Sequence, residues 1–183
     1  MDRRTIVRAS GVTLSGGLLA GCLGLGDGQG DKYAIEGDEN ADQLRVSMRG
    51  RSGSDPGPRF DPLIVWVTEG GTVIWEAETA GHSSTAFVQD QNVQRRIPHG
   101  AQGWNTGVGN TQGAVVANTF NTAGVYDYFC LNHFGEGMVG SVIVGRPTTG
   151  DQPGLTDPAN LSPAPSEELR AINERQRTAI QSD

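Results

Sequence analysis

Residue types that build many binding sites are scarce in this chain. Its 183 residues include three histidines, two cysteines and a single lysine, Lys32. Lys and Arg number 14 against 21 Asp and Glu, which gives a formal net charge of −7 at pH 7. The sequence lacks the basic stripe that meets phosphates, so the composition argues against a nucleic-acid partner. An acidic surface with almost no lysine is typical of salt-adapted proteins, where negative charge keeps the molecule soluble.

Residues 1–21 have the features of an export signal. A basic head precedes small, mildly apolar residues, and Leu19-Ala20-Gly21-Cys22 closes the segment. The apolar stretch is too short and too rich in Gly and Ser to span a membrane, which takes about 20 apolar residues. The pair Arg3-Arg4 is similar to a twin-arginine signal, and residues 19–22 are similar to a lipobox. We therefore expect export, with a lipidated Cys22 attaching the protein to the outer face of the membrane.

Two alternatives for Cys22 remain at this point. In the first, Cys22 is an incidental residue of a plain signal peptide. In the second, Cys22 forms a disulfide with Cys130, as cysteines of exported proteins often do. The disulfide is the weaker hypothesis, because Cys22 stands before a Gly-rich segment. Cys130, by contrast, lies in an apolar run beside residues that bind metals.

The folded domain is expected over residues 43–146. Residues 22–42 are rich in Gly and acidic residues, which predicts a flexible tether. Short apolar alternations separated by turn residues then follow, without a helical period. This pattern predicts an all-β fold, a Greek-key β-sandwich or barrel of about seven or eight strands. The expected strands are residues 44–48, 63–67, 72–75, 85–88, 114–120, 125–130 and 139–144.

Residues 147–183 are expected to be a Pro-rich linker followed by a tail. Within the tail, residues 166–180 place Leu169, Ile172, Ala179 and Ile180 roughly on one face of a possible short helix. That apolar stripe is narrow, so a frayed or disordered tail is favoured. A helix that docks a partner is the second hypothesis.

A thiol, an imidazole and a thioether share one short loop between two strand-like runs. Cys130 ends the first run, and His133 and Met138 follow three and eight residues later. Sulfur combined with imidazole nitrogen suits copper, and a Cys/His set with a weak axial Met suits a copper that only changes oxidation state. The loop therefore predicts most of a copper site, with one further ligand to come from elsewhere.

Two histidines remain as candidates for that ligand, His82 and His99. His82 follows Gly81 in a turn between two strand-like runs, whereas His99 lies in a loop marked by Pro98 and Gly100. His82 is favoured, because a turn that contains glycine brings the backbone close to a metal without a side-chain clash. His99 is expected to be an exposed loop residue.

The ordered set of His82, Cys130-Leu131-Asn132-His133 and Gly135-Glu136-Gly137-Met138 resembles the small blue copper proteins of the plastocyanin type. It is most similar to halocyanins, the membrane-attached members from salt-loving archaea. The likeness covers residues 43–146 and includes residues 70–75 and 140–144. It implies a cupredoxin fold with one type 1 copper, for which His82, Cys130 and His133 are the strong equatorial ligands. Met138 is implied to be the long axial ligand.

The ligand loop is rich in glycine and carries one charge, Glu136, so electrons are expected to enter and leave there. The expected electron-transfer surface comprises the His133 edge, Phe134 and Phe129. This sequence differs from the family pattern at Phe129, where plastocyanins often have an outward tyrosine. It differs again at Ser83, where an asparagine often ties the two ligand loops together.

The function implied is that of a blue copper protein that carries single electrons. Its partners are expected to be redox proteins of a respiratory or related electron-transport chain, membrane-associated or exported, and a monomer is expected. The alternative is an extracytoplasmic protein that binds or stores copper. A copper enzyme needs a second metal site, hence several more histidines, and His99 alone cannot supply one. A two-copper centre is excluded likewise, because it needs a second cysteine in the domain.

Overall fold

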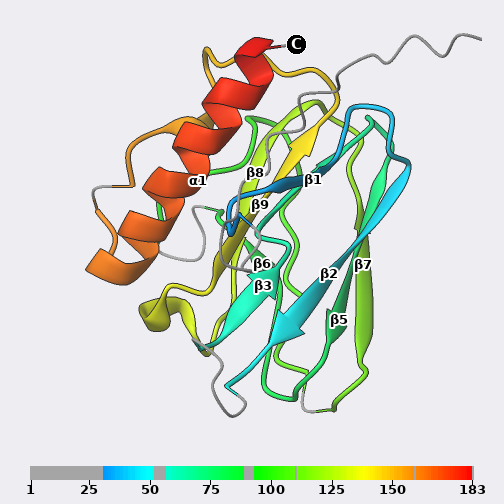
Figure 1. Cartoon of the computed structure of the whole chain (residues 1–183), viewed down its shortest axis with the longest axis vertical. Helices are drawn as coiled ribbons and strands as arrows, with labels where there is room; N and C mark the ends of the chain where they lie inside the picture. The colour runs from blue at the N-terminus through cyan, green and yellow to red at the C-terminus, as the bar shows by residue number, and fades with distance from the viewer. Residues whose placement is uncertain (1–30, 52–56, 89–92, 110, 159, 183) are drawn as a thin grey trace, which may run out of the picture.

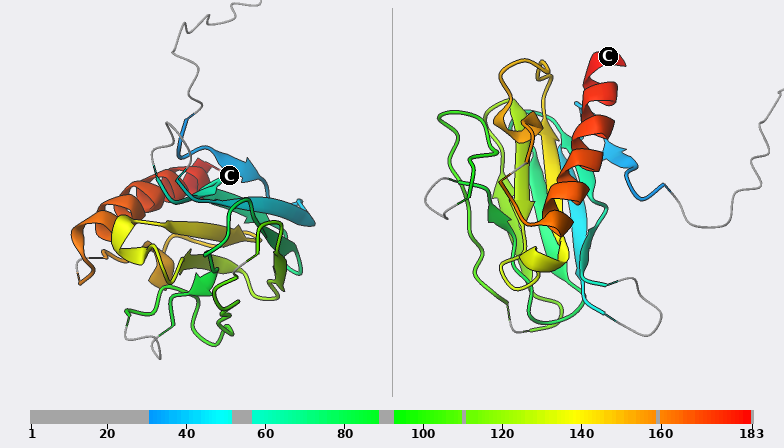
Figure 2. Two further views of the ribbon diagram at one scale, coloured as in Figure 1. Left: turned by 90° about the horizontal axis from the view of Figure 1, so that it is seen from below. Right: turned by 90° about the vertical axis from the view of Figure 1, so that its left-hand side faces the viewer.

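Two β-sheets face each other, and a C-terminal helix lies against one of them (Figures 1 and 2). The computed structural model describes residues 31–51, 57–88, 93–109, 111–158 and 160–182. The five-stranded sheet has the order β1 (Ile35–Gly37), β4 (Ile64–Val67), β9 (Val139–Val144), β8 (Gly124–Phe129) and β6 (Thr85–Ala86). The four-stranded sheet has the order β3 (Arg59–Asp61), β2 (Gln43–Arg49), β5 (Thr72–Ala77) and β7 (Val115–Thr119).

The β-sandwich confirms the predicted fold class, and all seven expected strands are present. Chain neighbours are not always sheet neighbours: β4 pairs in parallel with β9, and β2 with β5, so the chain crosses repeatedly between the sheets. The two additional strands, β1 and β3, are three residues long each. Three residues are too few to show an alternation of apolar and polar side chains. These strands are recognised only by their backbone pairing with β4 and β2.

The predicted domain boundary at residue 43 is wrong. β1 pairs in parallel with β4, with Ile35 opposite Ile64, and the Thr68 N–H donates to the Ala41 carbonyl. The second half of the expected tether is therefore part of the sandwich, because the edge of β4 offers its backbone to a strand too short to be recognised from its own sequence. Residues 22–30 of that tether, Cys22 included, lie outside the described residues.

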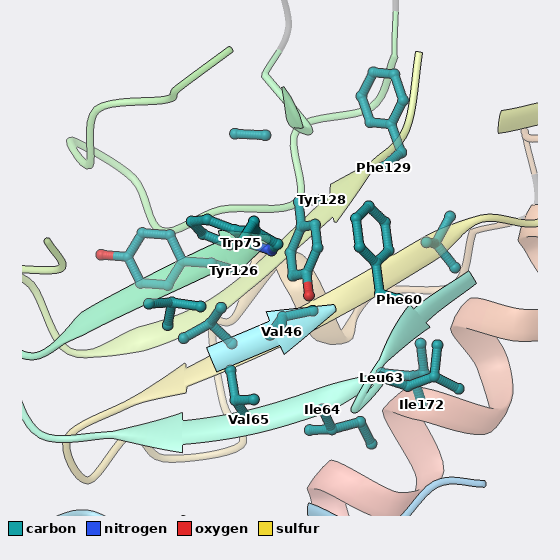
Figure 3. Close-up of a cluster of buried hydrophobic side chains, with 14 of the residues drawn as sticks. Val46, Phe60, Leu63, Ile64, Val65, Trp75, Tyr126, Tyr128, Phe129 and Ile172 are labelled. Carbon is teal, nitrogen blue, oxygen red and sulfur yellow. The ribbon is translucent and has the colours of Figure 1, made fainter. Parts of the chain in front are cut away.

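Aromatic side chains fill the space between the sheets (Figure 3). Trp75 lies at their centre, with its ring 5.3 Å from that of Tyr128 and 5.6 Å from that of Trp104. Trp104 is partly buried and packs against this core, and its indole N–H donates to the Ser84 hydroxyl at 2.9 Å. Side chains alternate along β8: Tyr126 and Tyr128 face the core, and Asp127 between them faces the other way, toward Arg96.

The C-terminal tail forms a helix, α1 (Pro163–Ser182), which corrects the favoured prediction of a disordered tail. Leu169 and Ile172 are completely buried, and Figure 3 shows Ile172 beside Leu63. Two polar residues widen the buried stripe: Gln176 donates to the Ser141 hydroxyl and Asn173 to the Thr156 carbonyl. A sequence pattern that counts only apolar residues misses them.

The helix explains why β9 is buried along its whole length, on both faces of its sheet. The opposite sheet covers one face, and α1 and the short 3₁₀ helix η3 (Pro153–Leu155) cover the other (Figure 2). Among the described residues, no helix has both the length and the apolar character needed to cross a membrane.

Candidate metal centre

Three potential ligands from distant parts of the chain meet at one end of the sandwich. His82 lies between β5 and β6, Cys130 directly follows β8, and His133 precedes the 3₁₀ helix η2 (Phe134–Glu136). Their ligand atoms all lie within 4.8 Å of one another. The Cys130 Sγ is 3.8 Å from His82 Nδ1 and 3.4 Å from His133 Nδ1. In each imidazole Nδ1 faces the sulfur, so the three atoms are placed to share one metal ion.

The fourth predicted ligand, Met138, belongs to the same loop and is 1% exposed. Its carbonyl accepts a hydrogen bond from the Cys130 N–H at 3.0 Å, and its own N–H donates to the His133 carbonyl at 3.2 Å. These backbone bonds close the loop and hold its three candidate ligands together. His99 lies elsewhere, exposed, in the lining of a separate pocket.

Ser83 ties the two ligand-bearing segments together. Its hydroxyl accepts a hydrogen bond from the Leu131 N–H at 2.8 Å, and its backbone N–H points to the Cys130 Sγ at 3.5 Å. Asn132 adds a bond in the opposite direction, from its amide to the Gly81 carbonyl at 3.0 Å. Plastocyanin-type proteins often have an asparagine at the position of Ser83. The shorter serine suffices here, because the two segments approach closely and Asn132 forms a second bridge between them.

His82 is held as a neutral ligand. Burial, and then the neighbouring His133, lower the pKa of His82, so that its imidazole keeps a lone pair for metal at neutral pH. Its Nε2 lies 2.8 Å from the Thr79 hydroxyl. A proton on Nε2 donated to Thr79 leaves Nδ1, the atom that faces Cys130, as the metal-binding nitrogen. Gly50 leaves room for this pair, since a Cβ there would lie 2.6 Å from the Thr79 Oγ1.

Sequence reasoning did not find Thr79. Its only signal is its position three residues before His82, in a turn where a threonine needs no functional explanation. The pairing depends on the fold of the turn, which spacing alone does not give.

Replacing Thr79 by valine tests this positioning role. Thr79→Val keeps the shape of the side chain but removes the hydroxyl that orients His82, so we expect Cu(II) affinity to fall by about 10- to 100-fold. Competition with a chelator of known affinity measures the change. Thr72→Val is the matched control, because Thr72 bonds to Thr119 at the other end of β5. Equal affinities for the two variants would contradict the role given to Thr79.

Phe129 does not lie on the surface, which corrects its predicted place in the electron-transfer surface. It is 4% exposed and packs against Phe87 and Phe134, with ring centroids 4.7 and 4.9 Å away. Phe129 lies on the side of β8 that faces away from the core aromatics, and these two rings cover that side. The partly exposed residues at this end are His133 and Phe134, beside Leu131, which is 39% exposed.

The donor set fits copper. One thiol sulfur, two imidazole nitrogens and a thioether on the same loop as the thiol are soft or borderline ligands, whereas hard cations such as Mg²⁺ and Ca²⁺ take oxygen ligands. No carboxylate belongs to the group of ligand atoms found among the described residues. The fold and this site together define a small copper-binding β-sandwich protein.

Comparison with known proteins gives the family. Residues 47–145 match the profile of the copper binding proteins of the plastocyanin/azurin family, and the chain belongs to that family. The resemblance drawn from the ligand motif is thereby confirmed.

Three relatives show the range of the likeness. The halocyanin of Natronomonas pharaonis is 27% identical over 168 residues, covering 79% of this chain and 98% of its own. The chloroplastic plastocyanin of Tetradesmus obliquus is 34% identical over 93 residues, which is 50% of this chain and 63% of the relative's length. The crystal structure of pseudoazurin from Methylobacterium extorquens AM1 superposes with a TM-score of 0.56 at 25% identity, covering 74% of this chain and 99% of its own.

Proposed function

We propose that this protein carries single electrons between redox proteins at the outer face of the cell membrane. The observation that supports this most strongly is the way Cys130 is held. It is fully buried, its sulfur is approached by the Ser83 N–H, and Ser83 and Asn132 lock the two ligand segments together. Because contacts within the protein set the ligand positions, little has to move when the oxidation state changes.

Copper bound at this site supplies a centre that gains or loses one electron. The chain excludes water from most of it, since His82 is 1% exposed and Met138 is equally buried. The second candidate function, copper storage or delivery, requires a metal that exchanges readily. Burial of three of the four candidate ligands favours the electron carrier over storage.

We propose that partners dock on a surface around His133, which we call the loop patch: Leu131, His133, Phe134 and Gly135. All four are at least partly exposed. Glu136 is the one charged residue of the ligand loop, and Arg51 neutralises it with a contact of 2.7 Å. Contact at the loop patch is therefore mainly apolar, which suits a highly charged protein in concentrated salt, where charge attraction is screened within about 3 Å at 1 M.

A charge placed in the loop patch tests this docking surface. Phe134→Glu is expected to slow electron self-exchange between the Cu(I) and Cu(II) forms by at least about tenfold, because two like charges meet when the patches approach. NMR line broadening of a mixed sample measures the rate. Asn121→Glu is the control, since this exposed residue lies in the turn before β8, at the end of that strand away from Cys130. Equal rates in both variants would place the electron route elsewhere.

Attachment to the membrane through Cys22 is a separate proposal, supported by the sequence of residues 1–22. Cys22→Ser is expected to move the protein from the membrane fraction to the soluble exported fraction of expressing cells, because the lipid is the only anchor proposed. Cys130→Ser serves as the control and is expected to remain with the membranes. If Cys22→Ser also stays in the membrane fraction, the lipid anchor is wrong.

A further inference from the structure

A second polar site lies far from the metal centre. A pocket of about 420 Å³ is lined by residues that include Gln94, Arg95, His99, Thr149, Asp151 and Arg177. α1 joins the two regions: the Ala164 carbonyl, near its start, backs onto Gly137 of the ligand loop. Arg177 comes thirteen residues later along the helix, about 20 Å at a rise of 1.5 Å per residue. The loop patch and this pocket are therefore separate surfaces.

The two arginines of the pocket differ from the other basic residues that the structure describes. Lys32 and seven arginines each form an ion pair with a carboxylate, and Arg59 also has a partner. In the described part of the chain, the two basic residues left without a carboxylate partner are Arg95 and Arg177. In a protein with an excess of acidic residues, two unpaired arginines beside a histidine in one pocket form a local positive site.

Backbone contacts hold both guanidinium groups in place. Arg95 donates through Nη2 to the carbonyls of Pro98 and Ala101, each at 2.8 Å. Arg177 donates to the carbonyl of Leu155. A guanidinium has five donor hydrogens, and among the described residues these backbone carbonyls are the only hydrogen-bond acceptors of the two groups. Donors therefore remain that are positioned but not satisfied by the protein itself.

We propose that this pocket binds a small oxyanion, a phosphate or a carboxylate, between Arg95, Arg177 and His99. Planar guanidinium groups match the oxygens of both anions and bind them strongly. Asp151, an exposed carboxylate in the same lining, opposes such an anion and limits its affinity. A bound anion links the loop of residues 94–101 to α1, so its binding stabilises the folded chain.

Thermal unfolding of the full chain, titrated separately with sodium phosphate and sodium succinate against sodium chloride at equal ionic strength, tests the proposal. We expect a saturable rise in Tm with phosphate or succinate beyond that with chloride, and the effective anion identifies the ligand class. Arg177→Gln is expected to weaken binding at least tenfold, and Arg177 is exposed enough for the variant to fold. Asp151→Asn is expected to tighten binding.

Arg175→Gln is the matched control, because Arg175 lies on the same helix but pairs with Asp31 outside the pocket. Its anion affinity is expected to equal that of the wild type. The proposal is overturned if chloride raises Tm as much as both anions do. It is equally overturned if Arg175→Gln and Arg177→Gln lose the same affinity, which would mean a general effect of charge.

Discussion

The wild-type protein loaded with Cu(II) is expected to show an intense visible absorption band that the Cys130→Ser variant lacks completely. Such a band needs a thiolate bound to copper, and a serine hydroxyl is not a soft sulfur ligand. The effect should be total, because Cys130 is the one cysteine among the described residues. Absorption spectra of the purified full chains, recorded before and after chemical reduction, make the comparison, and reduction should bleach the wild-type band.

The two other histidine positions sharpen this experiment. His82→Gly is expected to lose or strongly alter the band, because its Nδ1 lies in the ligand group. His99→Gly is expected to keep the wild-type spectrum, because His99 lies in the separate pocket. A wild-type chain that binds Cu(II) without an intense band would contradict the electron-carrier proposal and favour copper storage instead.

The ligand loop was predictable because its chemistry is local. Cys130, His133 and Met138 lie within nine residues, and a short loop between paired strands keeps them together wherever the rest of the chain goes. The sequence favoured His82 over His99, and the fold gives the physical reason why His82 reaches the ligand loop. The antiparallel pairing of β6 with β8, with Thr85 opposite Phe129, brings the His82 turn to the end of β8.

The helix was only the second hypothesis and the first strand was not predicted, for a different physical reason. Sequence periodicity detects apolar faces, but Asn173 and Gln176 of α1 are buried through hydrogen bonds rather than through apolar contact. β1 depends on the edge of β4 for its backbone partners. Phe129 is likewise buried by Phe87, a residue far from it in sequence. In each case a long-range partner determined the outcome.

The second large effect is expected from the buried ion pair between Arg96 and Asp127. Both side chains are completely buried, and Arg96 Nε lies 2.7 Å from the Asp127 carboxylate. Arg96 also donates to the carbonyls of Gly154 and Thr156, which anchors the η3 segment to β8. The Asp127 carboxylate further accepts from the Ser141 hydroxyl at 2.6 Å. One charged pair thus holds β8, β9 and the segment leading to α1.

Arg96→Met is expected to lower the free energy of unfolding by about 3–5 kcal/mol, because it leaves Asp127 buried without its counter-charge. Urea denaturation at pH 7 measures the loss. Arg170→Met is the matched control, since Arg170 forms an exposed pair with Asp157 and such pairs contribute about 0–1 kcal/mol. Similar losses in both variants would show that the buried pair does not hold the C-terminal segment on the sandwich.

The loss in Arg96→Met should also depend on pH. Burial raises the pKa of Asp127, and the Arg96 guanidinium and the Ser141 hydroxyl act against that rise. Without Arg96, the pKa of Asp127 in the folded protein rises further above its value of about 4 in the unfolded chain. The folded state then binds more protons than the unfolded state, so the stability of the variant falls as pH increases above about 4. Relative to the wild type, the variant should therefore be least stable near neutral pH, and its deficit should shrink on acidification. A deficit that stays constant from pH 4 to pH 7 would mean that lost packing, rather than an uncompensated Asp127 charge, causes the destabilisation.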